Sequence, residues 1–181
     1  MEDQLLVQKC LDGDQKACKM LFDRYASLMM ALCNRYIPHS AEAEDALQEG
    51  FIKVFKNLQN WKREGELGAW IRRIMVNTCL TKLKNNAISD TPLENTVEND
   101  FSEEAIGLSD ISYSEIEALI QALPLGYRTV FNLVVIDGYS YTEISNQLNI
   151  TESTCRSQFF KAKKLLGQQI IKLNSTINLT I

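Results

Sequence analysis

The sequence predicts an all-α protein of two small helical domains joined by an acidic flexible linker, and three observations support this prediction. The 181 residues include only 8 Gly and 3 Pro, with 45% hydrophobic residues, which suits compact helical structure. Apolar residues recur at helical spacing in several segments, whereas no segment shows a convincing strand pattern. An acidic segment with little helical periodicity separates two such regions. The expected domains span residues 1–86 and 114–174, with a linker over 87–113 and a tail over 175–181.

The first expected helix spans residues 16–36. Asp14 precedes it, and the Asp14 carboxylate can accept hydrogen bonds from the free backbone amides of the first turn. The helix should end before Pro38, because proline disfavours a helical conformation in the residue ahead of it.

Two further helices are expected in the first domain. Ser40 should cap a helix that runs to Leu58, with acidic residues favourably placed in its first turn. A polar loop over residues 62–66 then leads into a helix over residues 67–85. The side chains expected to be buried from the earlier helix are Leu47, Phe51, Val54, Phe55 and Leu58.

The second domain is expected to begin with a helix over residues 113–122. Leu123–Gly126 contains a proline and a glycine, and this segment should break the helix. A further helix over residues 127–136 should then lead into the C-terminal motif described next.

Residues 138–166 have the pattern of a helix-turn-helix. Ser140 and Glu143 form a capping box, so one helix should begin at Tyr141. Asn149 lies where the chain must reverse, and asparagine enters the left-handed backbone region more easily than most residues. Thr151 can cap the second helix. The apolar face expected for that second helix consists of Cys155, Phe159, Ala162 and Leu166.

The second helix of this motif is basic on its outward side. Its outward face is expected to carry Ser153, Arg156, Ser157 and Lys164, with Lys161 at the flank. A helix of this kind can read DNA, but an ordinary helical hairpin with solvated lysines has a similar pattern. Helix-turn-helix units also serve several classes of DNA-binding protein, so this segment alone does not decide the function.

Charge is distributed unevenly along the chain. The formal net charge is −4, with 19 basic and 23 acidic residues, which is unusual for a protein that binds DNA. Residues 86–114 contain seven acidic residues and no basic one, so the remainder has 19 basic and 16 acidic residues, a balance of +3. The basic residues concentrate in two windows, 72–84 and 152–172. The basic character of the chain is therefore split between two sites.

The helix over residues 67–85 has two unlike faces. The buried arc is expected to contain Leu67, Trp70, Ile71, Ile74 and Thr78. The opposite stripe is expected to contain Arg73, Asn77, Leu80 and Lys84. Cations can neutralise phosphates and an asparagine can pair with adenine edges, so this stripe is suited to DNA. A solvated amphipathic helix would have a similar pattern.

A second exposed face is expected on the helix that ends at Leu58. It consists of Asp45, Gln48, Glu49 and Ile52, at helical spacing. An exposed isoleucine beside two carboxylates suits a protein partner with basic side chains. The alternative is a surface helix with one stray apolar residue.

The loop after this helix combines an aromatic ring, amides and cations in Asn60, Trp61 and Lys62. Single-stranded DNA is bound by such a set, because bases stack on rings and the backbone follows cations. Trp61 is equally suited to covering the core, which is the commoner role of tryptophan.

The sequence argues against an enzyme. It contains neither a phosphate-binding glycine loop nor a nucleophile with its base and orienting group, and the single histidine, His39, lies in a Pro-His-Ser loop. The five cysteines contain no C-x-x-C pair, so neither disulfides nor a metal site is expected, and no cofactor is implied. No apolar run is long enough to cross a membrane and no signal peptide precedes the first helix, which predicts a cytoplasmic protein.

These motifs together resemble the bacterial sigma factors of the sigma-70 family, in particular the small extracytoplasmic-function (ECF) group. The first half is similar to the family's region 2 through AEDALQEGFIKVF at 43–55 and GAWIRRIMVNTCLTKLK at 68–84. The second half is similar to region 4 through LPLGYRTVF at 123–131, followed by the helix-turn-helix. Both signals in this order across a linker are highly specific, and they cover most of the chain.

The resemblance implies a factor that binds core RNA polymerase, recognises two promoter elements and helps to open the duplex. It implies that polymerase docks on Asp45, Gln48, Glu49 and Ile52. It implies that the minus-ten element and the unwound strand are bound by Arg73, Asn77, Lys84 and the loop residues Asn60, Trp61 and Lys62. It implies that the minus-thirty-five element is read by Ser153, Thr154, Arg156, Ser157 and Lys161.

Some positions depart from the family pattern. Ser145 stands where alanine is common, Gln158 stands where a basic residue is frequent, and Phe160 is expected to be exposed. An anti-sigma partner is common in the resembling family, although no residue here requires one. The main alternative function is a polymerase-independent regulator that uses the same helix-turn-helix, and it predicts tight duplex binding by the isolated chain.

Overall fold

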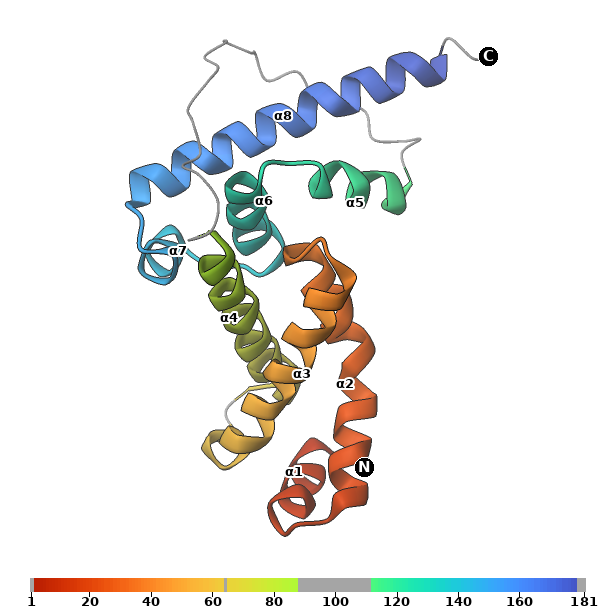
Figure 1. Ribbon diagram of the computed structural model, residues 1–181, viewed down its shortest axis with the longest axis vertical. Coiled ribbons are helices and arrows are strands. Elements are labelled where there is room, and N and C mark those ends of the chain that lie inside the picture. The colour runs from red at the N-terminus through yellow and green to blue at the C-terminus, as the bar shows by residue number, and fades with distance from the viewer. Residues whose placement is uncertain (1, 64, 88–111, 179–181) are drawn as a thin grey trace. The chain divides into compact units, whose positions relative to one another are not determined.

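The computed structural model describes residues 2–63, 65–87 and 112–178 (Figure 1). The chain divides into two compact units, unit 1 (Met1–Pro92) and unit 2 (Leu93–Ile181). The described residues form helices and no strand, which confirms the all-α class with two helical parts. The division falls within the segment expected to be a linker, and residues 88–111 of that segment lie outside the described residues.

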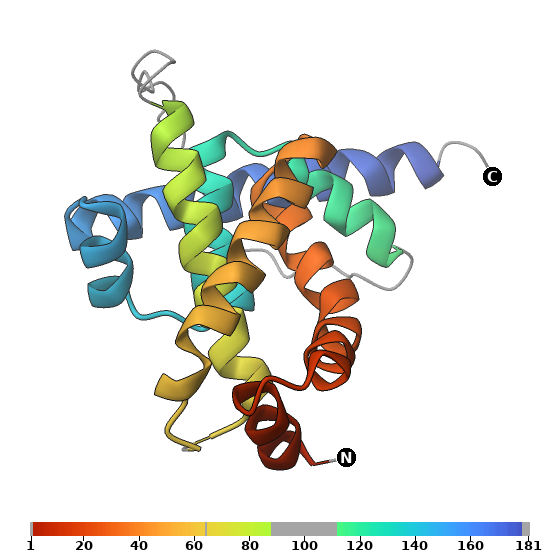
Figure 2. The same cartoon turned by 60° about the horizontal axis from the view of Figure 1, so that its bottom comes forward.

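Unit 1 is a bundle of helices that pack on one another. Its elements are α1 (Asp3–Leu11), α2 (Gln15–Tyr36), α3 (Ser40–Asn57), a 3-10 turn η1 (Leu58–Asn60) and α4 (Leu67–Ala87). Helices α2, α3 and α4 each contact the other two, and α1 packs on α2 (Figures 1 and 2). The core is formed by apolar side chains from all four helices, which bury the faces that would otherwise be exposed to water.

Both ends of α2 agree with the sequence prediction. Asp14 Oδ1 accepts hydrogen bonds from the backbone amides of Lys16 (2.9 Å) and Ala17 (3.2 Å). The helix ends at Tyr36, directly before Ile37 and Pro38. Local capping and the proline therefore define this long helix, as expected.

Two local features of unit 1 differ from the expectation. Helix α1 was not predicted, and it buries Leu6, Val7 and Cys10. Ser40 is the first residue of α3 and not its cap; His39 occupies the cap position without a side-chain cap hydrogen bond. The Ser40 hydroxyl instead donates to Glu44 within the helix, at 3.4 Å.

The exposed stripe predicted for α4 was wrong at one position. Leu80 is only 4% exposed, and Met75 and Cys79, which were not predicted in the core, are fully buried. Trp70 and Ile74, which were predicted in the core, are half-buried. Helix α4 contacts both α2 and α3, so its buried surface is wider than the single arc of a surface helix.

Unit 2 contains the helix-turn-helix and the helices before it. Its elements are α5 (Tyr113–Gln121), α6 (Leu125–Phe131), a π-helical turn η2 (Asn132–Ile136), α7 (Tyr141–Leu148) and α8 (Glu152–Asn178). Helix α8 contacts α5, α6 and α7, and so is the central element of the unit. Part of the core is a cluster of Leu123, Ala162 and Leu166, with Leu119, Ile120, Tyr127, Phe131 and Leu165 packed against it.

The helix-turn-helix has the predicted local geometry. Ser140 Oγ accepts from the amide of Glu143 (3.2 Å), and Glu143 Oε2 accepts from the amide of Ser140 (2.9 Å), which completes the capping box. Asn149 has φ 56° and ψ 45°, in the left-handed region. Thr151 Oγ1 accepts from the amide of Thr154 at 3.0 Å. The turn between α7 and α8 therefore depends on the residues that indicated it in the sequence.

The break predicted before α6 is shorter than expected. Pro124 occupies the cap position, and Leu125 and Gly126 already lie in the helix, since proline is compatible with a helix start. At the other end of the unit, α8 continues to Asn178, so residues 175–178, expected to belong to a tail, are helical.

All five cysteines are free thiols, and all except Cys18 are buried. Cys33 and Cys79 lie in contact, with their Sγ atoms 3.7 Å apart. Burial raises the pKa of Cys10 to about 12, with help from a hydrogen bond with Cys18, so this thiol is protonated at neutral pH. Within the described ranges, no helix is long and apolar enough to cross a membrane, and no cluster of potential metal ligands occurs.

Candidate nucleic-acid and polymerase interfaces

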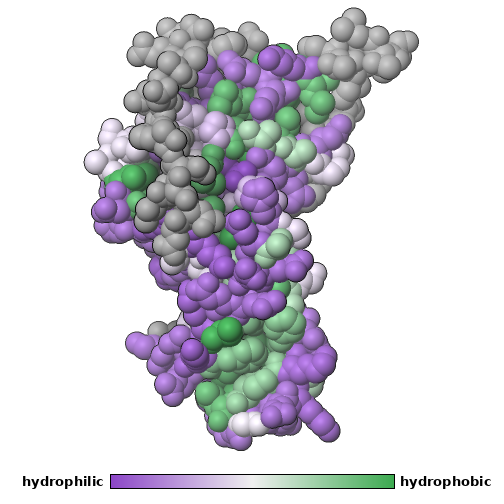
Figure 3. All heavy atoms as spheres, viewed as in Figure 1, coloured by the Kyte–Doolittle hydropathy of each residue, from purple (hydrophilic) through white to green (hydrophobic). Residues whose placement is uncertain are grey.

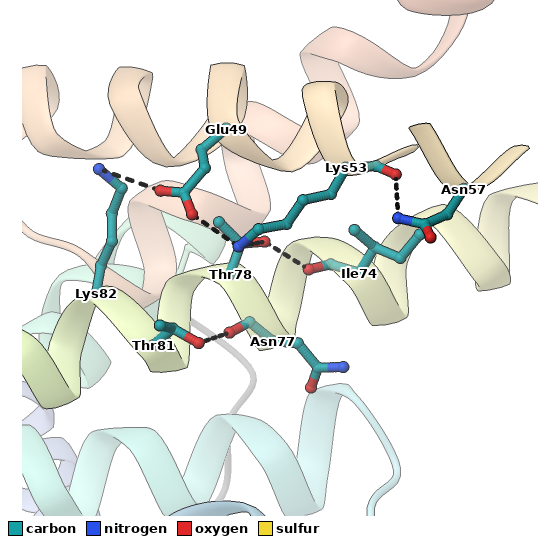
Figure 4. A network of polar contacts seen from close by, with 8 residues as sticks. All are labelled: Glu49, Lys53, Asn57, Ile74, Asn77, Thr78, Thr81 and Lys82. Atoms are coloured by element: carbon teal, nitrogen blue, oxygen red, sulfur yellow. Dashed lines mark hydrogen bonds and ion pairs between the residues drawn. The ribbon is translucent and has the colours of Figure 1, made fainter. Parts of the chain in front are cut away.

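The polar stripe of α4 is exposed apart from Leu80. Arg73, Asn77 and Lys84 all lie on the surface of unit 1. The backbone carbonyl of Asn77 accepts a hydrogen bond from Thr81 Oγ1 at 2.8 Å, and the Asn77 amide points away from α3 (Figure 4). The structure thus brings the three predicted polar residues onto one exposed face of α4.

The predicted docking face on α3 is divided by the structure. Asp45, Gln48 and Ile52 are exposed, and Ile52 exposes 53% of its surface. Glu49 is half-buried and faces α4 (Figure 4). The first three residues therefore form the accessible part of this face, which we call the α3 face.

Glu49 joins α3 to α4 through two lysines. Its Oε1 atom lies 2.7 Å from Lys53 Nζ, and its Oε2 atom lies 3.8 Å from Lys82 Nζ of α4. Lys53 Nζ also donates to Thr78 Oγ1 (3.3 Å), which in turn donates to the carbonyl of Ile74 (2.9 Å). The hydrogen bond from Lys53 lowers the pKa of Glu49, with smaller contributions from the charges of Lys53 and Lys82. This network was not predicted, because it depends on how two helices pack.

The loop after α3 exposes two of its three predicted residues. Asn60 and Lys62 are exposed, and Asn60 Nδ2 donates to Asn57 Oδ1 at 3.4 Å. Trp61 is only 8% exposed, and its Nε1 atom is buried without a hydrogen-bond partner among the described residues. Of the two roles considered for Trp61, the structure therefore supports covering the core, and the ring presents no open stacking surface in this structure.

In unit 2, the predicted reading residues of α8 lie near its start. Ser153, Arg156 and Ser157 are exposed, whereas Thr154 and Lys161 are half-buried. Phe160 follows them and is 60% exposed, as the sequence indicated. Together these side chains form a face, which we call the α8 face, with a hydroxyl-rich start and a basic continuation.

Arg156 is held by Glu152 and Tyr141 through contacts that were not predicted from the sequence. Its Nη2 atom lies 3.0 Å from Glu152 Oε2, and its Cζ atom lies 4.8 Å from the centre of the Tyr141 ring. Glu152 Oε1 accepts a hydrogen bond of 2.6 Å from Thr142 Oγ1. The bonds from Thr142 and then Arg156 lower the pKa of Glu152. The i, i+4 spacing of Glu152 and Arg156 was a signal for the ion pair, whereas the role of Tyr141 depends on packing.

A buried arginine supports the helices ahead of the α8 face. Arg128 is 5% exposed, and its Nη1 atom donates to the carbonyl (2.8 Å) and to Oε1 (3.3 Å) of Gln121 at the end of α5. Burial lowers the pKa of Arg128. This arginine satisfies carbonyl groups at a helix end and has a structural role.

Comparison with known proteins gives two matches to family models. Residues 21–87 match the sigma-70 region 2 model, and residues 113–166 match a sigma-70 region 4 model. The first match covers α3, α4 and most of α2, and the second covers α5 to α7 and the first half of α8. The α3 face, the loop after α3 and the polar residues of α4 therefore lie in the first matched region, and the α8 face lies in the second.

Relatives are similar over nearly the whole chain. The ECF RNA polymerase sigma-E factor of Escherichia coli (strain K12) is 30% identical over 185 residues, which cover 94% of this chain and 95% of that protein. The sigma-E factor of Haemophilus influenzae is 28% identical, over 94% of this chain and 96% of that protein.

A similar fold occurs in a solved structure, the sigma factor RpoE from Bartonella quintana in complex with the anti-sigma factor NepR. Its TM-score is 0.53 and its identity 16%, over 85% of this chain and 96% of that chain. The all-helical fold, the two matched regions and the full-length similarity agree with one another, and this chain belongs to the ECF group of the sigma-70 family of RNA polymerase sigma factors.

Proposed function

We propose how the work of this sigma factor is divided among its surfaces. The α8 face reads the upstream, minus-thirty-five element, and the α4 residues Arg73, Asn77 and Lys84 read the downstream, minus-ten element. The observation that carries this proposal is the presence of an exposed polar and basic helix face in each of two units, although the whole chain is acidic.

The loop after α3 acts on the unwound strand. Asn60 and Lys62 are exposed and suited to contact bases and phosphates. The buried Trp61 side chain between them packs on the core and anchors the loop. A buried Trp61 restrains the backbone of both neighbours, so its contribution to DNA opening is indirect.

Core polymerase binds the α3 face. Asp45 supplies charge, Gln48 supplies hydrogen bonds, and Ile52 supplies an apolar anchor that is otherwise unfavourable in water. Glu49 supports this face from behind through its ties to Lys53 and Lys82. The factor has no covalent chemistry of its own, and it acts in the cytoplasm, where polymerase and promoter DNA are found. An anti-sigma protein is a further candidate partner of the same exposed surfaces.

Run-off transcription tests the proposal as a whole. Core polymerase with the full chain is given a promoter library, and the selected promoters are then used with base changes in each element. Arg156→Ala should reduce the preference for the natural upstream element by about tenfold, whereas Asn77→Ala should do so for the downstream element. Equal losses at both elements for each variant would contradict the assignment.

Docking is tested by charge reversal with a matched control. Asp45→Arg should weaken the binding of core polymerase in a pull-down with purified components. Ile52→Ala, as a separate variant, should weaken this binding more than Asp45→Arg does. Asp23→Arg is the control, since Asp23 is an exposed carboxylate on α2, outside the α3 face, that pairs with Lys19 at 2.6 Å. Unchanged polymerase binding by Asp45→Arg and Ile52→Ala would remove the α3 face from the proposal.

A further inference from the structure

Glu152 lies at the point where the two helices of the helix-turn-helix meet. One carboxylate oxygen accepts a hydrogen bond from Thr142 of α7, and the other pairs with Arg156 of α8. Each oxygen therefore already has one partner inside the unit.

The guanidinium of Arg156 is fixed on two sides. The Glu152 carboxylate lies 3.0 Å from its Nη2 atom, and its Cζ atom lies over the Tyr141 ring, 4.8 Å from the ring centroid. The Arg156 side chain is nevertheless 61% exposed. An arginine usually loses much rotamer freedom when it binds, and these contacts remove part of that freedom before any DNA arrives.

The remaining donors of Arg156 suit one particular base. A guanidinium has five N–H donors in a planar fork, and the ion pair described above uses one of its terminal nitrogens. Another edge stays able to donate to the N7 and O6 atoms of guanine, the commonest specific contact in the major groove. The orientation of the fork then decides whether both hydrogen bonds form together.

We propose that Glu152 is a specificity-determining residue of the upstream interaction, because it orients Arg156 for bidentate recognition of a guanine. This inference rests on the proposed role of the α8 face in reading the upstream element. Glu152 is a positioning residue and makes no contact with the base. Tyr141 supports the same orientation through its ring.

Repulsion of DNA by Glu152 and positioning of Arg156 by Glu152 predict different effects when the carboxylate is removed. A carboxylate near DNA repels phosphates, so removing its charge should favour binding to any sequence. Removing an orienting group should instead lower the preference for one base pair. Glu152→Gln should therefore lower the discrimination at one position without weakening the binding to unrelated DNA.

The test uses the holoenzyme and a promoter that wild type selects from the library. Binding is measured by competition with duplexes that carry each base substitution in the upstream element, and with a duplex whose upstream element is scrambled. Glu152→Gln should reduce discrimination at one guanine by about tenfold, while binding to the scrambled duplex stays equal or becomes stronger. Tyr141→Leu should reduce the same discrimination, and Tyr141→Phe, which keeps the ring, should retain it.

The coupling of the two residues gives the deciding comparison. In an Arg156→Ala background, Glu152→Gln should have no further effect on discrimination, since the residue it orients is gone. Circular dichroism of each variant checks that α7 and α8 are retained. If Glu152→Gln strengthens binding to every duplex by one common factor, the positioning role is overturned. If Arg156→Ala itself leaves the preference unchanged, the proposed function of the α8 face fails instead.

Discussion

Unit 1 and unit 2 each use a glutamate to hold basic side chains, but the two pairings have different consequences. Glu49 lies between α3 and α4 and joins them through Lys82, at 3.8 Å, as well as pairing with Lys53 on its own helix. Glu152 pairs with Arg156 on its own helix, at 3.0 Å, and leaves that arginine open to solvent. A glutamate ion pair therefore joins two helices of the bundle in unit 1, whereas in unit 2 it holds an arginine that remains exposed.

The two units also differ in what stabilises them. Of the largest fully buried side chains in the described residues, all except Leu133 and Ile144 belong to unit 1. Unit 2 has two capping boxes, at Ser112 and Ser140, and a left-handed turn at Asn149. Unit 1 thus depends mainly on burial of apolar area, while local hydrogen bonds carry a larger share in unit 2. Figure 3 shows apolar surface (green) at the end of unit 1 that carries α1, so burial in unit 1 is extensive but incomplete.

The largest expected effect comes from matched core substitutions. Ile71→Ala and Ile144→Ala each remove a fully buried isoleucine, and each should lower the free energy of unfolding by about 2–5 kcal/mol. Ile71 lies in the larger core, which is less able to collapse around the cavity. Ile71→Ala should therefore lower the free energy of unfolding more than Ile144→Ala does. Urea unfolding followed by circular dichroism measures both. Leu28→Ala, at an exposed position on α2, is the control and should have little effect.

A smaller effect is expected at the turn of the helix-turn-helix. Asn149 adopts φ 56°, where a β-branched side chain is strained, so Asn149→Val should lower the free energy of unfolding by about 1–2 kcal/mol. Asn149→Gly should be close to neutral, because glycine adopts this conformation easily. Thermal unfolding of the two variants gives the comparison, and equal stability of both would contradict a strained turn.

The capping boxes should contribute about 1 kcal/mol each. Ser140→Ala removes the acceptor for the Glu143 amide, and Ser112→Ala removes the matching acceptor for the Glu115 amide. Ser40→Ala is the comparison in unit 1, where Ser40 is not a cap. Its effect on the unfolding midpoint should be smaller than that of either capping serine; an equal effect would refute the contrast between the units.

The smallest expected effect concerns the Glu49 pairing and its dependence on pH. The pKa of Glu49 is lower in the folded protein than in the unfolded chain, so its contribution is present above the unfolded pKa and is lost as the pH falls through the folded pKa. Glu49→Gln should therefore cost less than about 1 kcal/mol at neutral pH and nothing in acid. Stability curves of wild type and variant against pH should converge as the pH falls through the folded pKa of Glu49. A difference in stability between wild type and Glu49→Gln that stays constant with pH would mean that the charge of Glu49 is not the cause of the difference.

The sequence predicted those features that depend on hydrogen bonds between near neighbours. The Asp14 cap, the Ser140 capping box and the Asn149 turn were all correct, because each involves residues within a few positions of one another. The exposure of Arg73, Asn77 and Arg156 was also correct. Helical periodicity is sufficient for such positions when a helix has one buried face.

The features that were missed depend on packing between distant segments. Helix α1 has weak periodicity, since Leu5 and Leu11 are exposed while Leu6 is buried against the bundle. Leu80 was predicted to be exposed because the prediction assumed one buried face on α4. In the structure α4 has neighbours on two sides, and Leu80 is buried. The ties of Glu49 to Lys82 and of Arg156 to Tyr141 join different helices, and no periodicity within one helix indicates them.

The position of the tryptophans makes the unfolding of one unit visible by itself. Trp61 is buried, Trp70 is half-buried, and both belong to unit 1, which leaves unit 2 without an indole. Tryptophan fluorescence, excited selectively over tyrosine, therefore reports on unit 1 alone, whereas far-ultraviolet dichroism reports on the helices of both units. Transitions that coincide by the two signals would mean that the units unfold together, and separate transitions would give each unit its own stability.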